Sequence, residues 1–311
     1  MLTSSLDAVA PEVSVVLATY NHARYIENAI ESVRSQQTGR PFELIISEDA
    51  STDGTRAIVE ATARRDPRVR LCLSPSNLRS NEVIARGIRA ARGRYICLLD
   101  GDDHWIVSDK LERQAAFLDQ NVNASACFHN ALIVCGEAEE PGNHRWTPGA
   151  QATRTNGSDI WRGNPFATSA GMMRRAALSS LGDWYADFFP ITDWPLYILC
   201  AEQGELCFID EPVAAYRLHD GGLFSSLPGR QKLDMTASFY RRMDRATGGR
   251  LHGEAQRGCA FYFVEWAEAY AAAGNNSMAW ACAWKALRSG TLVRDRTLFA
   301  RWRQVLKHGF F

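Results

Sequence analysis

Residues 95–103, YICLLDGDD, decide how the chain folds. A short apolar run that stops at an acidic turn is typical of a buried strand that ends in a loop. The turn brings Asp100, Asp102 and Asp103 within four residues, and two such charges about 4 Å apart repel by roughly 4 kcal/mol at an effective dielectric of ~20. The turn relieves this repulsion by facing water, by protonating one carboxyl group, or by binding a hard divalent cation. The turn alone leaves these alternatives open.

The composition is that of an ordinary globular chain. Of its 311 residues, 46% are hydrophobic and 23% are charged, enough for one large domain with an appendage or for two domains. Lys and Arg (35) balance Asp and Glu (35), which argues against a nucleic-acid partner. The eight cysteines include no CxxC pair, so we expect reduced core cysteines rather than disulfides or a zinc site. With no secretion signal and no apolar stretch long enough to span a bilayer, we expect a cytoplasmic protein.

Strand and helix patterns alternate at short spacing through the first hundred residues. Apolar strand-like runs occupy residues 13–18, 42–47, 69–73 and 95–99, with amphipathic helical patterns between them. This alternation predicts a doubly wound α/β layer with a mainly parallel sheet. Ligands bind such sheets beyond the carboxyl ends of the strands, and polar clusters follow three of these runs at 19–21, 48–53 and 100–103. Independent solvated loops have no reason to share one edge, so we interpret the three clusters as one site.

The rest of the chain divides by pattern. Residues 136–160 are rich in Gly, Pro, Asn and Thr without periodicity, as in a functional lid or a disordered loop. We expect a flexible leader at 1–12, one α/β domain at 13–228 and a helical extension at 229–311. Further short strands are predicted at 124–128, 131–134, 206–209 and 213–216, and helices at 231–246, 254–273 and 277–288.

The strand-end motifs, taken in order, resemble those of the family-2 inverting glycosyltransferases of the GT-A fold. The motifs are TYN at 19–21, EDASTDGT at 48–55, LDGDD at 99–103, Asp193-Trp194, and YRLH at 216–219. The resemblance covers residues 12–225. It implies a Rossmann-like, doubly wound and mainly parallel GT-A sheet as the nucleotide-sugar-binding and catalytic domain, followed by the all-helical extension.

The same resemblance implies the ligands. A member of this family moves a sugar from a nucleotide-sugar, expected here to be a UDP-sugar, to a hydroxyl group of a glycan, glycolipid or protein acceptor in polysaccharide, glycan or glycolipid biosynthesis. The resemblance also implies Mn²⁺ or Mg²⁺ at the acidic turn, which reads as a DXD motif. By position, Asp193 matches the catalytic base, Asp102, Asp103 and His219 match metal ligands, and Thr19, Tyr20, Asn21, Asp49, Asp53, Arg79, Arg86 and Asp100 match nucleotide-sugar contacts.

These residue types suit glycosyl transfer. The transition state gathers negative charge on a departing diphosphate, and a divalent ion held by Asp102 or Asp103 offsets that charge. A carboxylate such as Asp193, ionised at a reference pKa near 3.9, can take the proton of the attacking hydroxyl group. Two alternatives stay open, because Asp193 is also placed to cap a helix and His219 also suits a hydrogen-bonded loop.

One motif departs from the family pattern. Relatives often carry Asn-x-Gly in the helix before the acidic strand, where this chain has Ala85-Arg86-Gly87. The Asn contact is therefore absent or made differently, and we expect Arg86 or Arg79 to face the diphosphate instead. The chain has neither GxGxxG after its first strand nor GxxxxGK[ST], which argues against dinucleotide oxidoreductases and P-loop enzymes. A nucleotidyltransferase and a catalytically degenerate transferase acting as a scaffold are the alternative functions.

The last segment has more than one interpretation. Leu298, Phe299, Trp302 and Val305 lie on one helical face, and basic residues dominate its surroundings. Such a helix suits peripheral contact with the inner face of an anionic membrane. It equally suits packing against the preceding helical pair or, in a homodimer, against a second copy of the chain.

Overall fold

The computed structural model describes residues 10–136, 138, 141–147, 153–155, 157–223 and 227–308. Most of the predicted leader, residues 1–9, lies outside the described residues. The chain forms two compact units, one of Met1–Thr155 with Pro165–Asp220 and the other of Asn156–Asn164 with Gly221–Phe311. The short segment Asn156–Asn164, which we had expected in the α/β domain, therefore packs with the helices of the second unit.

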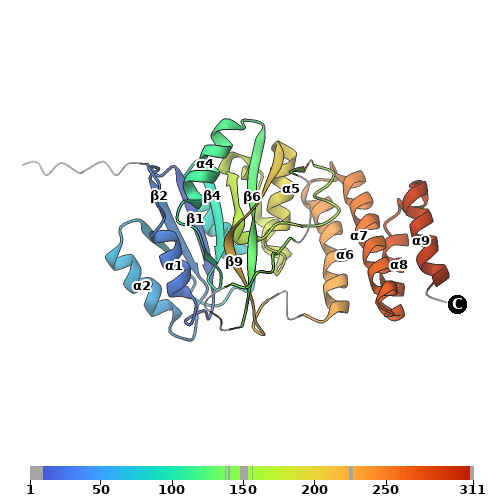
Figure 1. The fold of residues 1–311 in the computed structure, drawn as a ribbon, viewed down its shortest axis with the longest axis horizontal. Helices are drawn as coiled ribbons and strands as arrows, with labels where there is room; N and C mark the ends of the chain where they lie inside the picture. Colours follow the sequence, from blue (N-terminus) through green and yellow to red (C-terminus); the bar gives the residue numbers. More distant parts are fainter. Residues whose placement is uncertain are drawn as a thin grey trace, which may run out of the picture. The chain divides into compact units, whose positions relative to one another are not determined.

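A parallel half-sheet organises the first unit. Strands β3 (Val69–Leu73), β2 (Phe42–Glu48), β1 (Val13–Thr19) and β4 (Tyr95–Asp100) lie side by side in that order (Figure 1). Their interiors are apolar on both faces because helices cover both sides, as in a βαβ layer. The predicted doubly wound, mainly parallel sheet is confirmed.

Alternate residues of β1 face different helices. Val15 and Leu17 belong to the core that includes residues of three helices, α1 (Ile26–Arg34), α2 (Thr55–Arg65) and α4 (Lys110–Gln120). Val16 faces the opposite way, toward α3 (Glu82–Ala90), where a Cβ on Gly87 would lie 2.4 Å from Val16 Cγ1. The glycine therefore lets α3 approach the sheet closely.

The second half of the sheet mixes directions. Strand β8 (Gly171–Arg174) is antiparallel to both β4 and β6 (Ala124–Cys135), and β6 runs parallel to β9 (Glu205–Leu218). Two short strands, β5 (His104–Trp105) and β7 (Arg154–Thr155), pair with β9. Between β8 and β9 lies α5 (Trp194–Gln203), and the 3₁₀ turn η1 (Thr168–Ala170) precedes β8.

The prediction of four separate short strands here is wrong, since β6 and β9 are each continuous. The β6–β9 register shifts on both sides of Asn130. At this position the Asn130 side chain takes the place of a backbone acceptor in the neighbouring strand. Its Oδ1 accepts from the backbone N–H of Ala131 (2.9 Å) and of Thr147 (3.2 Å). Such a bulge interrupts the alternation that identifies a strand in sequence.

The second unit is helical, as predicted. It consists of α6 (Gly229–Ala246), α7 (His252–Ala272), α8 (Asn276–Leu287), the turn η4 (Leu292–Arg294) and α9 (Arg296–His308), together with Asn156–Asn164. Gly274, at a φ of 72°, ends α7, and the Asn275 side chain caps α8 by accepting from Met278 N–H at 3.2 Å. Within the described residues, every helix is too short or too polar to cross a membrane.

Trp161 anchors the short segment in this helical unit. Its side chain is only 2% exposed, and its carbonyl oxygen accepts from the Tyr240 hydroxyl at 2.8 Å. Gly258 of α7 makes room for it, since a Cβ there would lie 2.3 Å from the Trp161 oxygen.

Candidate active site

The polar ends of three parallel strands share one edge of the sheet. Thr19 at the end of β1 pairs with Glu48 at the end of β2, and Ala18 pairs with Asp100 at the end of β4. The loops that follow stay together, because Asp49 N–H donates to Thr19 O at 3.0 Å and Gly101 N–H donates to Ala18 O at 2.9 Å. The three polar clusters singled out in the sequence therefore lie on neighbouring strand ends.

Asp49 is held rigidly at the β2 end. It is 6% exposed, and its Oδ1 accepts from the Ser74 hydroxyl at 2.7 Å. Both carboxylate oxygens also lie 3.0–3.1 Å from Leu78 N. A carboxylate has about four acceptor positions, so Asp49 keeps capacity to accept from a donor outside the protein. A ring N–H of a nucleobase is such a donor.

Arg86 stabilises the end of β2 and the Ser74 side chain. Its guanidinium donates to Ser74 Oγ (2.6 Å), Ser47 Oγ (2.7 Å) and Glu48 O (2.9 Å). Ser74, in turn, bonds Asp49, so Arg86 fixes the Asp49 side chain through one intermediate. These bonds engage the guanidinium on the protein, and the diphosphate contact expected of Arg86 stays a prediction.

Asn21 and Asp53 tie the β1 and β2 loops together. Asn21, at a φ of 56°, donates its N–H to Ser51 Oγ at 2.9 Å, and its Oδ1 accepts from Thr52 N–H at 2.8 Å. Asp53 accepts from Ala23 N–H at 3.0 Å. Both side chains thus brace the loops around the site.

Two more of the residues expected at the nucleotide, Tyr20 and Arg79, are exposed. Tyr20 is 37% exposed, although the preceding residue, Thr19, is buried. Arg79 is exposed and has a φ of 45°, in the left-handed region that is uncommon for a non-glycine residue. The structure leaves both side chains at the surface, where a ligand can reach them.

Asp102 and His219 form the central pair of the site. His219 Nε2 lies 2.9 Å from Asp102 Oδ2, and His22 Nε2 approaches the same oxygen at 3.9 Å. The hydrogen bond to Asp102 raises the pKa of His219 against the opposing effect of burial. Burial favours the neutral form of Asp102, but the His219 hydrogen bond and the His22 charge outweigh it, and the pKa of Asp102 is lowered. Asp102 is therefore an ionised acceptor in the structure as it stands.

Asp103, which follows Asp102 in the chain, is buried. It is 2% exposed, and its Oδ1 accepts from Arg217 N–H at 2.8 Å. Its Oδ2 has no hydrogen-bond partner among the residues that the structure describes. Burial and then the charges of Asp102 and Asp100 raise the pKa of Asp103. The buried Arg217 also donates from Nε to Asp102 O at 3.0 Å, so one arginine organises the acidic turn.

Asp100 links the acidic turn to Asp193. Burial, followed by the charges of Asp102 and Asp193, raises the pKa of Asp100 to about 8. Charge effects on a pKa fall off with distance in a protein. Asp100, Asp102 and Asp193 therefore belong to one electrostatic cluster, although Asp193 lies far along the chain from the other two.

Asp193 has the helix-capping geometry that we considered. Its Oδ1 accepts from Trp194 N–H at 2.7 Å at the start of α5, and its Oδ2 accepts from the Thr168 hydroxyl at 3.1 Å. Burial and the Asp193 charge raise the pKa of Tyr185 and of Tyr197 well above the usual value. Two neutral phenols thus lie near this carboxylate.

A buried polar network holds the turn that carries Thr168. Three consecutive carbonyl oxygens each accept from a side chain: Ser169 O from Trp105 Nε1 (2.9 Å), Ala170 O from Gln114 Nε2 (2.9 Å) and Gly171 O from Lys110 Nζ (3.2 Å). Lys110 is fully buried and also bonds Gln114 Oε1 at 2.7 Å. The network fixes η1, and η1 presents Thr168 to Asp193.

The acidic turn suits a divalent cation that shares its coordination with a ligand. In the described part of the chain no three His, Cys, Asp or Glu side chains converge as a metal site, and of the three expected ligands only Asp102 and His219 meet. Mg²⁺ is usually bound by one or two carboxylates together with substrate phosphates and water, so a pair of protein ligands beside the unpartnered Asp103 Oδ2 fits such an ion.

Sequence reasoning missed His22, Ser74 and Thr168. His22 directly follows the motif at 19–21, so its position at the strand end offered a signal. Ser74 and Thr168 offered none, because each is recognised only by the carboxylate it contacts, 25 residues away in both cases.

Comparison with known proteins identifies relatives of the chain. Residues 14–182 match the family model of Glycosyl transferase family 2. An uncharacterized protein of Mycobacterium tuberculosis H37Rv is 31% identical over 214 residues, 68% of this chain and 60% of that protein. The succinoglycan biosynthesis protein ExoO of Rhizobium meliloti is 43% identical over 137 residues, 42% of this chain and 38% of ExoO. The chain thus spans about 60% of the length of the first curated relatives that it matches.

Solved structures share the fold. Residues 1–349 of S. aureus TarS in complex with UDP-GlcNAc superpose with a TM-score of 0.55 at 19% identity, covering 81% of this chain and 80% of that TarS chain. The mannosyltransferase PcManGT from Pyrobaculum calidifontis, in complex with GDP-Man and Mn²⁺, gives a TM-score of 0.55 at 18% identity, covering 96% and 85%. At these identities the likeness concerns the fold alone.

Proposed function

The chain belongs to glycosyl transferase family 2, and on that premise we propose that it is a metal-dependent, inverting glycosyltransferase that uses a UDP-sugar. The family resemblance and the GT-A fold class expected from the sequence are confirmed. The observation that carries the proposal is the shared edge of the sheet, where Asp49 follows β2 and the hydrogen-bonded pair Asp102–His219 follows β4, on either side of β1. In this proposal Asp102 supplies a carboxylate for the leaving group and Asp193 another for the acceptor.

Asp49 selects the base in this proposal. Its remaining acceptor capacity suits the ring N–H of uracil, while Ser74 and Leu78 keep the carboxylate in one orientation. Tyr20 follows Thr19, whose carbonyl oxygen bonds Asp49 N–H, and its exposed side chain offers a ring for the base or ribose. Asp100 suits a sugar hydroxyl group, with which a carboxyl group can exchange hydrogen bonds in either protonation state.

Asp102 and His219 would hold Mn²⁺ or Mg²⁺ at the diphosphate. When bound, such an ion supplies Lewis-acid stabilisation of the negative charge that develops on the leaving diphosphate. Arg217 holds the acidic turn in place for the ion, because its Nε donates to the Asp102 carbonyl oxygen and its N–H donates to Asp103 Oδ1. PcManGT, which was solved with Mn²⁺, supports this assignment only in that it shares the fold of this chain.

Asp193 is the base in the proposed reaction. Its Oδ1 is engaged by the helix N-terminus, which favours the ionised form, and Thr168 holds Oδ2. An acceptor hydroxyl group that attacks the anomeric carbon passes its proton to this carboxylate as the C–O bond to the diphosphate breaks. A single displacement of this kind inverts the anomeric centre.

The acceptor that we propose is a hydroxyl group of a growing glycan in polysaccharide biosynthesis. The relative ExoO, named as a succinoglycan biosynthesis protein, supports this class. All eight cysteines are free, which favours a reducing compartment, and we propose that the protein works in the cytoplasm.

Slow hydrolysis of the donor tests the proposal without knowledge of the acceptor. With Mn²⁺ and an α-linked UDP-sugar, proton NMR of the freshly released sugar should show the β anomer. Asp193→Asn should lower the rate by about 10²–10⁴-fold, as expected for the loss of a general base, and should leave UDP binding unchanged. The control Asp183→Asn changes an exposed carboxylate nearby and should keep the rate. Release of the α anomer, or full activity of Asp193→Asn, would contradict the proposed mechanism.

A further inference from the structure

Helix α8 exposes two tryptophans on one face. Trp280 is 43% exposed and Trp284 is 55% exposed. They are four residues apart and therefore neighbours on the helix surface, and the exposed Arg288 continues the same row. Two large apolar rings exposed side by side form a patch, and such a patch favours an interface more than a single exposed ring does. The buried residues of α8 face the rest of the helical unit: Ala279, Cys282, Ala283 and Ala286.

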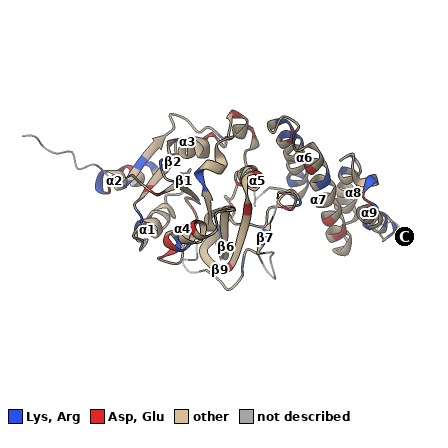
Figure 2. Ribbon diagram, turned by 90° about the horizontal axis from the view of Figure 1, so that it is seen from above, with Lys and Arg blue, Asp and Glu red and all other residues tan. Residues whose placement is uncertain are grey.

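Helix α9 exposes a row of cations. Arg296, Arg303 and Lys307 are spaced by seven and four residues, so they share one side of the helix. The buried Leu298 and Val305 lie on the opposite side. Figure 2 colours these Lys and Arg positions blue along α9.

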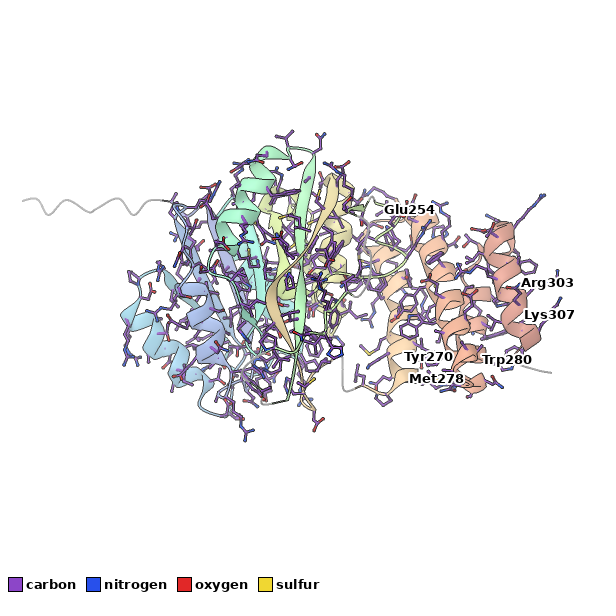
Figure 3. The ribbon with its side chains drawn as sticks, viewed as in Figure 1. Glu254, Tyr270, Met278, Trp280, Arg303 and Lys307 are labelled. Carbon is purple, nitrogen blue, oxygen red and sulfur yellow. The ribbon has the colours of Figure 1, made fainter. Side chains whose placement is uncertain are left out.

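The two rows belong to adjoining helices. Trp302 Nε1 of α9 donates to Ala283 O of α8 at 2.9 Å, which fixes the contact between the helices. Figure 3 shows Trp280 on α8, and Arg303 and Lys307 on α9, on the side of these helices that faces away from α6. We use the name α8–α9 surface for the exposed tryptophan and cationic residues of these adjoining elements: Trp280, Trp284, Arg288, Arg294, Arg296, Arg303 and Lys307.

The cations of this surface have no internal function that the structure reveals. Arg301 pairs inward with Glu268, whereas none of the five cations of the α8–α9 surface has an ion-pair partner among the described residues. Arg294 and Arg296 stand at the N-terminus of α9, the end at which the helix dipole disfavours positive charge. Local helix stability therefore does not explain them, and an external anionic partner does.

We propose that the α8–α9 surface binds an anionic lipid bilayer, with the tryptophan rings at the level of the headgroups. Tryptophan favours the membrane interface because its ring is apolar and its N–H is polar. Arginine and lysine are attracted to anionic lipids. The chain as a whole has no net charge, so the attraction depends on this local row of cations and not on the overall charge. A second copy of the chain fits less well, since a two-fold contact would set identical cationic rows against each other.

Vesicle sedimentation of the full chain tests this proposal. Vesicles of phosphatidylcholine alone and vesicles with about one third phosphatidylglycerol are compared; only the anionic vesicles should bind the protein. Each cation near the surface contributes about fivefold in binding, so Arg296→Gln, Arg303→Gln and Lys307→Gln together should weaken binding about 100-fold. Trp280→Ser with Trp284→Ser should weaken it at least tenfold.

Matched controls lie elsewhere in the same unit. Arg230→Gln, Arg241→Gln and Arg245→Gln in α6 remove the same number of charges from exposed positions. Trp266→Ser removes a tryptophan that is 41% exposed but stands in the row of Tyr262 and Tyr270 on α7. Both controls should bind anionic vesicles within about twofold of the unchanged chain, against the 100-fold expected per three surface charges.

Two results would overturn the proposal. The first is equal binding of the α9 variant and its α6 control, which would assign the effect to total charge. The second is an unchanged chain that forms dimers in analytical ultracentrifugation, loses them in the tryptophan variant and ignores both kinds of vesicle. The readout is sedimentation alone, so failure here leaves the proposed transferase reaction standing, and the reverse also holds.

Discussion

Asp193 shows how one side chain can serve structure and chemistry together. Capping a helix uses one carboxylate oxygen, Oδ1, and leaves Oδ2 to the Thr168 hydroxyl. A capping aspartate is held in one orientation, which is a property that a general base needs. The alternatives of cap and base that the sequence left open are therefore compatible.

Thr168 is a positioning residue by this argument. Thr168→Val keeps the side-chain shape but removes the hydroxyl donor, so Asp193 loses one restraint. We expect kcat to fall about tenfold, equivalent to a lost hydrogen bond of about 1.4 kcal/mol, with little change in KM for the donor. Thr168→Ser should restore the rate. Steady-state kinetics with both variants provide the measurement, and a fall confined to KM would contradict the role.

His129 makes the core sensitive to acid. It is 2% exposed beside Gln114, and burial, with the charges of Lys110 and Arg113, lowers the pKa of His129 from 6.5 to about 4. The folded state keeps His129 neutral where the unfolded chain binds a proton, so stability is lost as pH falls from 6.5 to about 4. This difference in pKa corresponds to about 3 kcal/mol.

Urea denaturation at several pH values measures this effect. His129→Gln should show a smaller loss of unfolding free energy between pH 7 and pH 4 than the unchanged chain, by up to about 3 kcal/mol. Parallel pH profiles for the two proteins would assign the acid sensitivity to other groups.

At the scale of residues, the sequence identifies acids better than it identifies their partners. Asp49, Asp102 and Asp193 stand out because they follow strands or precede a helix, and such positions are local features. Their partners Ser74 and Thr168 are ordinary residues locally. Only the fold brings them to the carboxylates, so no pattern in the sequence could reveal them.

At the scale of elements, strong periodicity is what made prediction possible. The helices expected at 231–246 and 277–288 correspond to α6 and α8 within one or two residues at each end, because several turns of amphipathic pattern define them. The sequence pattern divided each of the continuous strands β6 and β9 in two, near the place where their register shifts around Asn130. A bulge is satisfied by tertiary contacts such as that of Asn130 with Thr147, and these are invisible in the sequence.

Helix α7 offers a matched test of tertiary packing. A Cβ at Gly258 would meet the Trp161 oxygen at 2.3 Å, whereas a Cβ at Gly253 would meet only the end of the flexible Arg257 side chain at 3.4 Å. Gly258→Ala should lower the free energy of unfolding by about 1–3 kcal/mol through overpacking. Gly253→Ala should raise it by up to about 1 kcal/mol, because alanine favours the helix. Thermal unfolding of the two variants decides, and equal shifts would show that Trp161 does not dock as described.

At the scale of the whole molecule, the alternation of strands and helices was enough to predict the fold class, and the ordered strand-end motifs pointed to the family. The division of the chain was harder to predict. Residues 156–164 carry no periodicity, yet Trp161 packs beside Gly258 in the helical unit, about a hundred residues along the chain. A single tryptophan in an aperiodic stretch has no pattern that names its partner. The expected boundary at residue 228, between an α/β domain and a helical extension, therefore stays a proposal.

The central claim is that Asp49, Asp102 and Asp193 serve one ligand. Isothermal calorimetry of UDP with and without Mn²⁺ tests it most directly, using Asp49→Asn, Asp102→Asn, Asp193→Asn and, as a control in the other unit, Asp234→Asn in α6. Asp49→Asn should weaken binding about 10- to 100-fold, as expected for a charged hydrogen bond, and Asp102→Asn should remove the gain from Mn²⁺. Asp193→Asn and Asp234→Asn should bind like the unchanged chain. UDP binding that ignores Mn²⁺ and is unaltered in both Asp49→Asn and Asp102→Asn would contradict the account.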